Sequence, residues 1–422
     1  MEYFMRNRKK QIFAGAVVLT ACLILGVTVK RGSREGAPET QETGPKVTLL
    51  QDFKAKIKAQ ETGPKVTLLQ DFKAKIKAQE TGPKVTLLQD FKAKIKAIQT
   101  AGLWKPNPPL KSCSETPGST PCYDTKCSKR TAQGFEERLQ SVMQLTETVN
   151  TTLRDHIMEV MKVRHSGTRV LIVTGASSDH FLESQGLIQS LHQNVFPELD
   201  NYTFVYYDLG LDSKQREQLK KHCRCEVRRY PVEKMPHMHQ KLRCYTWKPF
   251  IIEANIRSTD ILIWADASVR FQKSAIGPLI KEANTKGAIM PVYPPQYAIS
   301  DHVQKITFDY FSEQTCHFAQ VGEMAATFLV FKNERFIREA ILKPWIACAL
   351  DSRCMCPSDP EKLIVCYTHV RKYNKCHRFD QAALNVLLAK LFWGNEQSFT
   401  LSRKYINIQK EDKVHYFEHL GI

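Results

Sequence analysis

Among the residues with the potential for chemistry, Asp266 comes first, because it directly follows a buried apolar run. The run at 260–265 (DILIWA) has the length and composition of a strand, and Ala267 and Ser268 follow the acid before alternation resumes. A carboxylate in the turn after such a strand can hold a divalent cation that neutralises a diphosphate. It can equally cap the turn by accepting backbone N–H groups. The spacing alone leaves both roles open.

Two further acids are candidates for a catalytic base. Asp380 lies in the first turn of a predicted helix, and Glu323 precedes an apolar strand expected over 325–331. A general base has to come within hydrogen-bonding distance of the hydroxyl that it deprotonates. Acids are also favoured at helix N-termini by the macrodipole and by capping, and a loop acid can simply be solvated. We keep these structural roles as the alternatives for both residues.

Several cations and histidines lie between these acids. Arg243 and Lys248 flank Trp247 and can form ion pairs with a diphosphate, or can be surface cations without a role. His237 and His239 stand one residue apart on a Pro-flanked loop, a pattern that is most often incidental rather than a metal site.

The elements that position these residues alternate along the chain. We expect strands at 169–174, 202–207, 225–230 and 260–265, with helices at 179–192, 213–221 and 247–256. Such alternation indicates a parallel sheet with helices on both faces, in which ligands bind at the carboxyl ends of the strands. Two segments lie at these ends, residues 175–179 and residues 266–268.

Residues from about 168 to 400 resemble the GT-A class of glycosyltransferases. The resemblance is carried by RVLIVTGASS, ILIWADASVRF, MAATFLVFKN and a helix that opens with RFDQAALNVLL. A Trp-x-x-Cys segment, Trp345 to Cys348, is similar to one in a poorly characterised branch of GT-A-like animal proteins. The resemblance implies a Rossmann-like, mixed but mostly parallel sheet, a nucleotide-sugar donor, and a glycan or glycoprotein acceptor.

The resemblance also implies roles for particular residues. Asp380 or Glu323 would face the acceptor, and Asp266 would hold Mn²⁺ or Mg²⁺. The donor would contact residues at both strand ends and the two cations: Thr174, Gly175, Ala176, Ser177, Arg243, Lys248, Asp266 and Ser268. GT-A enzymes typically carry Asp-x-Asp where this chain has Asp266-Ala267-Ser268. The missing carboxylate weakens the expected metal site, which Ser268, or a late His415 or His419, would have to complete.

The N-terminal region predicts a type II membrane protein. Residues 12–29 form an apolar run without a charge, long enough to span a bilayer core of about 30 Å. Basic residues precede the run, which favours a cytoplasmic tail at 1–11 and a lumenal remainder. A cleaved signal peptide is the alternative, although Lys30 and Arg31 follow at once without a cleavage pattern.

Cysteines and sequons agree with a lumenal domain in the Golgi or elsewhere in the secretory pathway. One of the 13 cysteines, Cys22, lies in the apolar run, and the other twelve follow it, which suggests six disulfides. We expect each member of the close pairs Cys223/Cys225 and Cys354/Cys356 to bond a distant partner. Asn150 and Asn201 head two N-glycosylation sequons.

Between the anchor and the domain lies a predicted stalk at 30–111. The sequence QETGPKVTLLQDFKAKIKA occurs there three times without a change, at 41–59, 60–78 and 79–97. Each copy has the apolar spacing of a short helix, and a Gly-Pro pair separates the copies. A Cys-containing linker and helix at 112–167 then lead to the catalytic domain at 168–422. Either the stalk or a helical stripe at 133–163 could pair two chains as a homodimer.

The net charge of +18 does not indicate a nucleic-acid partner. Residues 1–111 carry 21 Lys and Arg against 9 acids, so most of the excess lies in the stalk and the membrane flank. The first functional hypothesis is a lumenal, metal-assisted glycosyltransferase. The alternative is a non-catalytic, membrane-tethered glycan-binding protein on the same scaffold, and an adhesion protein displayed by its stalk is a third.

Overall fold

The computed structural model describes residues 86–107, 128, 130–163, 167–291, 297–357, 366, 376–401 and 404–420. These residues belong to one compact unit that begins at Lys84. The predicted tail, anchor and first two repeats lie outside the described residues, as does most of the Cys-containing linker. In the part of the chain that is described, no helix is both long and apolar enough to cross a bilayer.

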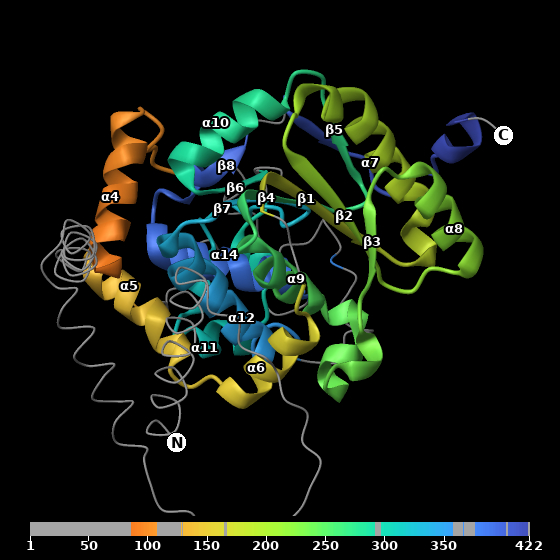
Figure 1. The fold of residues 1–422 in the computed structure, drawn as a ribbon. Coiled ribbons are helices and arrows are strands. Elements are labelled where there is room, and N and C mark those ends of the chain that lie inside the picture. The colour runs from red at the N-terminus through yellow and green to blue at the C-terminus, as the bar shows by residue number, and fades with distance from the viewer. Residues whose placement is uncertain are drawn as a thin grey trace, which may run out of the picture. The chain divides into compact units, whose positions relative to one another are not determined.

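A seven-stranded sheet forms the centre of the fold, with the strand order β3-β2-β1-β4-β7-β6-β8 (Figure 1). The strands are β1 (Thr168–Ala176), β2 (Tyr202–Asp208), β3 (Glu226–Arg229), β4 (Thr259–Ala265), β6 (Ala288–Pro291), β7 (Phe328–Lys332) and β8 (Thr400–Leu401). Strands β3, β2, β1 and β4 run parallel to one another, whereas β7 is antiparallel to both β4 and β6. The prediction of a mixed, mostly parallel sheet is therefore confirmed. A second sheet pairs β5 (Val269–Phe271) with β9 (Ile406–Ile408).

Both faces of the central strands are buried, which explains their continuous apolar sequences. In β1, Leu171 and Val173 face one core, and Val170 and Ile172 face the other. The first core is covered by helices α4, α5, α6, α9, α12 and α14, and the second by α7, α8 and α10 (Figure 1). Their bounds are α4 (Leu87–Thr100), α5 (Phe135–Met143), α6 (Thr151–Val160), α7 (Phe181–Asn194), α8 (Ser213–His222), α9 (Trp247–Ile256), α10 (Ile276–Lys286), α11 (Lys305–Tyr310), α12 (Lys343–Leu350) and α14 (Phe379–Phe392).

The described part of the third repeat, residues 86–97, belongs to this folded unit. Its helix α4 begins after Thr86, whose side chain accepts the backbone N–H of Gln89 in a capping box. Phe91 is fully buried and stacks on Phe336 with 4.9 Å between the ring centroids. Ile98, which follows the last repeat residue, is also fully buried. The folded unit thus starts inside the segment that the sequence assigns to the stalk.

The predicted stripe at 133–163 forms two helices instead of one. Helix α5 ends at Met143, and α6 begins after Asn150, whose side chain accepts the backbone N–H of Leu153. A helix N-cap of this kind starts a new helix rather than continuing the old one. Asn150 and the other sequon residue, Asn201, are both exposed.

The disulfides correct one prediction. Cys223 and Cys225 are bonded to each other, although we expect distant partners from their spacing. A turn between α8 and β3 brings these two sulfurs together, which a simple count of cysteines does not reveal. For the second pair, Cys356 has the expected distant partner, Cys244, 112 residues away, whereas Cys354 bonds Cys348, only 6 residues away. The remaining described bridge is Cys366–Cys376.

Candidate functional site

The candidate site is built around Lys248, in the first turn of α9. Its side chain is almost fully buried, and its ammonium group lies 3.1 Å from Oδ1 of Asp266 and 2.7 Å from Oδ2 of Asp380. It also donates to the carbonyl of Ala326 at 3.2 Å. An ammonium group has three donors, so the three partners satisfy it. We call Lys248, Asp266 and Asp380 the Lys248 triad.

The charges of the Lys248 triad follow from this geometry. Burial alone would lower the pKa of Lys248, but the two carboxylates outweigh it and raise the pKa, so the ammonium stays protonated. Burial raises the pKa of Asp380, and the charge of Asp266 adds to the effect, while Lys248 opposes it. One cation faces two carboxylates, so with both acids ionised the triad carries a net negative charge.

Asp266 is the accessible member of the triad. It follows β4 as the sequence predicts, and its side chain is 29% exposed against 8% for Asp380. Its Oδ1 accepts the indole N–H of Trp264 at 2.6 Å as well as the ammonium of Lys248. No contact among the described residues involves Oδ2, which leaves one carboxylate oxygen open to a ligand.

Asp380 is held by the helix that the sequence singles out. The side chain of Gln381 accepts the backbone N–H of Ala326, and Asn385 bonds both the N–H and the carbonyl of Met324. These side-chain amides bind the backbone of residues 324 and 326. Strand β7 therefore begins at Phe328 and not at the predicted residue 325. The indole of Trp345 donates to the carbonyl of Asp380 at 3.1 Å. The DQ-x-x-LN and Trp-x-x-Cys segments therefore fix the position of Asp380.

Two aromatic residues beside the triad have left-handed backbone conformations. Tyr245 has a φ of 55° and Phe379 a φ of 36°, and their rings are 5.8 Å apart. Residues other than glycine adopt this region at a cost of about 1 kcal/mol or more, and such residues gather at functional sites. Burial raises the pKa of Tyr245, with Asp380 as the next contribution.

A cleft of about 670 Å³ adjoins the carboxyl end of β1. We call it the β1 cleft. It is lined by the turn after β1, by the start of α7, by α8 and by the C-terminal segment: Ser178, Asp179, His180, Phe181, Leu182, Glu183, Gln185, Gln215, Gln218, Glu411, Asp412, Lys413, His415, Phe417 and Glu418. Five acids against one lysine give it a negative character.

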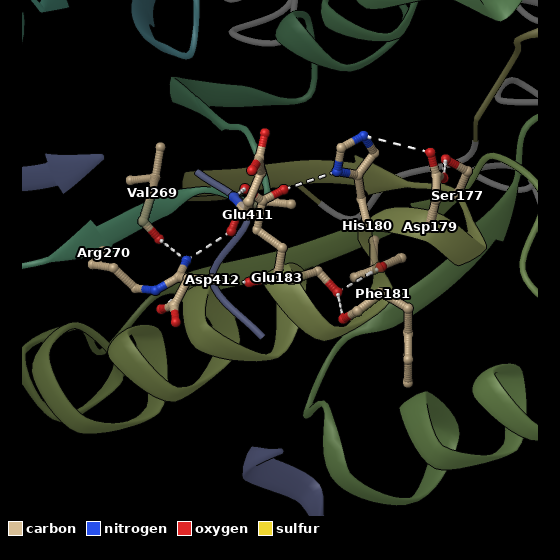
Figure 2. A network of polar contacts seen from close by, with 12 residues as sticks. Ser177, Asp179, His180, Phe181, Glu183, Val269, Arg270, Glu411 and Asp412 are labelled. Carbon is tan, nitrogen blue, oxygen red and sulfur yellow. Dashed lines mark hydrogen bonds and ion pairs between the residues drawn. The ribbon is translucent and has the colours of Figure 1, made fainter. Parts of the chain in front are cut away.

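A polar network joins several of the residues that line the β1 cleft (Figure 2). Nδ1 of His180 lies 2.9 Å from Oε2 of Glu183, and its Nε2 lies 3.7 Å from Asp179. The bond to Glu183 is the main reason that the pKa of His180 is raised. Ser177 donates to Asp179 and lowers the pKa of that acid. Glu183 in turn accepts the N–H of Glu411, which ties the C-terminal segment to α7.

The two regions are electrostatically connected. The negative charge of Asp266 contributes to the raised pKa of His180, and that of Asp179 contributes to the raised pKa of Tyr245. Charges influence one another in this way over distances up to about the screening length, about 10 Å at 0.1 M salt. The ends of β1 and β4 therefore form one acidic edge, as expected from the parallel pairing of these strands.

The structure brings together most of the residues that the sequence nominates, but not all of them. Arg243 is exposed and lies outside the Lys248 triad, in the short turn before α9. Ser268 is buried, so its hydroxyl is less accessible to a ligand than the carboxylate of Asp266. His415 lines the β1 cleft, where its Nδ1 bonds Glu418 at 2.8 Å. His419 is exposed near the end of the described chain.

The residues after β1 differ in their access to ligands. Thr174 is fully buried, and its hydroxyl donates to the carbonyl of Ala265 at 2.6 Å, joining the ends of β1 and β4. Ala176 is also buried, whereas Gly175 and Ser177 are half-buried. A Cβ on Gly175 would meet Tyr207 and Leu209 at 3.3–3.4 Å, so a larger residue would crowd the neighbouring strand.

Glu323 lies in a buried network rather than in open solvent. Its side chain is 1% exposed and accepts from His302 at 2.7 Å, from Arg378 at 3.0 Å and from Gln381. Arg378 and Gln381 flank Asp380 in sequence, so Glu323 anchors the start of α14. His239 forms no metal tract with His237: it is fully buried against Phe250, and burial lowers its pKa to about 4.

Sequence reasoning missed Asp179, His180 and Glu183 as individual site residues. The signal was present, since Asp179 ends the segment placed at the carboxyl end of β1. However, a sequence with an acid and a histidine at a helix start does not reveal whether an open cleft lies beside that helix. The pairing with the C-terminal segment is a contact across more than 200 residues, and no local pattern indicates it.

Among the described residues at this edge, no group of three His, Cys, Asp or Glu side chains has the spacing of a preformed metal centre. Among the described residues, the only three potential ligand groups whose ligating atoms all lie within 4.8 Å of one another are His302, Cys366 and Cys376, elsewhere in the fold. Two oxygens at Asp266 could serve as metal ligands: its own Oδ2, and the hydroxyl of Thr327, which has no partner among the described residues. The carbonyl of Thr327 accepts the N–H of Asp266 at 2.8 Å. A magnesium-type ion is commonly held by one or two carboxylates together with substrate phosphates. The donor set therefore fits an ion that arrives with a diphosphate.

Comparisons with known proteins give one partial family match and several distantly similar structures. A family described as "Protein of unknown function (DUF1647)" matches residues 119–253, a stretch that contains Lys248 but ends before Asp266. No curated protein matches the chain. Among solved structures, the chain is similar to core-mannan synthase A from Aspergillus fumigatus in its Mn/GDP form, with 8% identity, a TM-score of 0.35, and coverage of 58% of this chain and 76% of that one.

Two further similar structures are also glycosyltransferases. The galactosyltransferase LgtC, in complex with donor and acceptor sugar analogues, has 13% identity and a TM-score of 0.31, with 59% of this chain and 93% of that one covered. The bifunctional enzyme WbbM has 12% identity and a TM-score of 0.34, and the match covers 56% of this chain but only 39% of WbbM. At these scores, the chemistry of this chain has to be argued from its own side chains.

Proposed function

We propose that this chain is a glycosyltransferase that moves a sugar from a nucleotide-sugar donor to a hydroxyl group of a glycan or glycoprotein. One observation carries the proposal: a buried lysine joins the strand-end acid Asp266 to Asp380 at the edge of the sheet, where the β1 cleft also opens. A structural ion pair would need only one acid. Here two acids converge on one lysine, and the oxygen of the more exposed acid remains free.

In this proposal Asp266 directs Oδ2 toward Mn²⁺ or Mg²⁺ bound with the donor diphosphate, with His415 as a possible additional ligand from the C-terminal segment. The ion would supply charge neutralisation to the departing diphosphate. Lys248 and the indole of Trp264 hold Oδ1, which fixes the orientation of the carboxylate. The residues after β1, Gly175 and Ser177 with Asp179, would contact the nucleotide.

We assign the role next to the reacting sugar to Asp380 instead of Glu323. Both acids are buried, but three side chains already bind the carboxylate of Glu323, whereas the ion pair of Asp380 uses Oδ2. A carboxylate that has fewer side-chain partners can orient a sugar hydroxyl or stabilise positive charge on the sugar ring. Glu323 then serves the same site by anchoring the helix that carries Asp380.

A second function is favoured by the altered metal motif. Ser268 takes the place of the second acid and is buried, so one carboxylate oxygen remains where two acids are typical of the GT-A class. A non-catalytic, membrane-tethered glycan-binding protein would need no more than this. In either case we propose a location in the Golgi or another secretory-pathway membrane, with the domain in the lumen, N-glycans on Asn150 and Asn201, and a possible homodimer through the stalk.

A donor panel tests the proposal. The purified chain is incubated with UDP-, GDP- and CMP-sugars, with and without Mn²⁺, and both donor hydrolysis and thermal stability are measured. We expect one donor to give metal-dependent turnover that falls at least 100-fold in Asp266→Asn. The matched control is Asp260→Asn, which removes an exposed acid at the other end of β4 and should leave turnover unchanged.

The outcomes separate the two functions. Glycan binding that needs neither metal nor donor, with no turnover for any nucleotide sugar, would favour the binding protein. Turnover that survives Asp266→Asn would remove the triad from the chemistry and overturn the proposed mechanism.

A further inference from the structure

Two sulfur atoms and an imidazole form a compact cluster near the start of α14. Cys366 and Cys376 form a disulfide, and a ring nitrogen of His302 lies within 4.8 Å of both sulfurs. Cysteine and histidine are the ligands that Zn²⁺ prefers in proteins, and sets of three such ligands with an open fourth position are common. The cluster therefore has the composition of a zinc site in which the two sulfurs are bonded to each other.

The surroundings of His302 fit the role of a metal ligand. Its side chain is 3% exposed, and Nδ1 lies 2.7 Å from Oε2 of the buried Glu323. No contact among the described residues involves its Nε2. When Nδ1 donates its hydrogen to Glu323, Nε2 carries the free lone pair. A carboxylate behind a histidine in this way fixes the tautomer and orientation of zinc-ligating histidines.

We propose that Cys366, Cys376 and His302 form a redox-controlled Zn²⁺ site, closed while the disulfide is intact and open once it is reduced. A dithiol reductant supplies the two electrons: its own two thiols become a disulfide, and their protons pass to the sulfurs of Cys366 and Cys376. Zn²⁺ then displaces the two thiol protons, which leave to solvent, and forms two Zn–S bonds and one Zn–N bond. The two states exclude each other, because each sulfur bonds either the other sulfur or the metal.

The site has a direct structural connection to α14. Glu323, which holds His302, also binds Arg378 and Gln381, and these residues flank Asp380. The carbonyl of His302 accepts the N–H of Arg378 at 3.0 Å. A metal that draws His302 toward the two sulfurs would therefore strain the contacts at the start of this helix. The inference rests on these contacts and not on the proposed function.

Cobalt(II) is the probe for the site, since thiolate ligation gives it an absorption band that colourless Zn²⁺ lacks. The full chain is reduced with a dithiol, freed of reductant under inert gas, and titrated with Co²⁺. We expect one equivalent to bind with a thiolate-to-cobalt band, and Zn²⁺ to displace it. His302→Gln should weaken binding at least tenfold, whereas the double variant Cys223→Ser/Cys225→Ser, which removes another described bridge, should bind normally.

A second variant avoids reduction, which could unfold the chain. Cys366→His frees the thiol of Cys376, keeps the other bridges intact and restores a third ligand. We expect it to bind Co²⁺ without reductant at least tenfold more tightly than Cys366→Ala, which has two ligands left. Equal binding by Cys366→His and Cys366→Ala, or binding to the reduced chain that is unchanged in His302→Gln, would overturn the proposal.

Discussion

Two clusters of acids and cations at the same edge of the sheet have very different surroundings: the Lys248 triad and the His180–Glu183 pair. In the Lys248 triad the lysine and Asp380 are more than nine-tenths buried, and three polypeptide segments distant in sequence enclose them. In the β1 cleft, His180 is 55% exposed and pairs with Glu183 only three residues away. The contacts have similar lengths, but one is fixed by the tertiary fold and the other by a single helical turn.

The difference shows that ion-pair geometry alone does not indicate energetic weight. A buried pair that loses one partner leaves an uncompensated charge, at a cost of about 3–5 kcal/mol, whereas an exposed pair contributes about 0–1 kcal/mol. The triad is therefore a rigid element that presents Oδ2 of Asp266. In the β1 cleft the half-exposed imidazole of His180 can change partners at a smaller cost, although Glu183 itself is buried. A site that combines both can hold a fixed reacting group beside an adaptable binding surface.

The largest expected effect is that of Lys248→Met. This change keeps the volume of the side chain but leaves Asp266 and Asp380 as two neighbouring carboxylates without a cation, so we expect the free energy of unfolding at pH 7 to fall by about 3–5 kcal/mol. Chemical denaturation measures it. The double variant Lys248→Met/Asp380→Asn should recover a large part of the loss. A loss below about 1 kcal/mol in the single variant would show that the triad is not a rigid element.

A smaller effect is expected for Trp345→Phe. The carbonyl of Asp380 loses the indole N–H, and the smaller phenyl ring leaves a cavity at this fully buried site, so we expect a loss of about 2 kcal/mol in unfolding free energy. If this contact positions Asp380, turnover of an identified donor should fall further than that of Trp104→Phe, a change in a half-buried tryptophan outside the site. Equal effects of the two variants on turnover would assign Trp345 to packing alone.

For the β1 cleft, Glu183→Gln should lower the pKa of His180 toward its ordinary value, because the bond to Glu183 is the main cause of the raised pKa. A folded-state pKa above the unfolded value means that the extra stability is fully present below about pH 6.5 and is lost as the pH rises through the folded pKa. Since His180 is half-exposed, we expect this contribution to stay below about 1 kcal/mol. NMR titration of the imidazole and unfolding at pH 5.5 and 8 measure both quantities. A pKa that does not move in the variant would contradict the assignment.

The smallest expected effect is a change in the stability loss of each variant when the salt concentration is raised. Raising ionic strength from about 0.1 to 1 M shortens the screening length from about 10 to 3 Å, which weakens exposed pairs but hardly touches buried ones. The stability loss of Glu183→Gln at pH 5.5 should therefore shrink in high salt, while that of Lys248→Met should stay the same. Similar salt sensitivity in both variants would mean that the triad is hydrated.

Much of the site could be predicted because its residues lie at the ends of strongly patterned elements. Asp266 follows an apolar strand, and Asp380 opens an apolar helix, so both positions are visible in the sequence. The role of Lys248 was only partly visible, since LRCYTWKPF does not reveal whether its lysine points outward or inward. The sequence predicts Glu323 as a solvated loop acid, because no local pattern shows that His302, Arg378 and Gln381 surround it.

The repeats teach the same lesson about the fold. Three identical copies suggest that all three belong to the stalk. Residues 86–97 of the third copy nevertheless belong to the folded unit. Ile98 distinguishes this copy, since the equivalent positions after the first two copies are Gln60 and Gln79. Ile98, just after the repeat, therefore adds apolar surface to the part of α4 that is buried in the folded unit.

The sequence by itself determined the alternating strands and helices, the strand-end position of Asp266 and the helix that carries Asp380, because periodicity and propensity act over neighbouring residues. Only the tertiary structure decided which charges are buried together, which cysteines bond, and that the C-terminal segment closes one wall of the β1 cleft. Those outcomes depend on contacts between residues tens to hundreds of positions apart. Their energies come from burial and Coulomb attraction in the folded state, which local sequence does not encode.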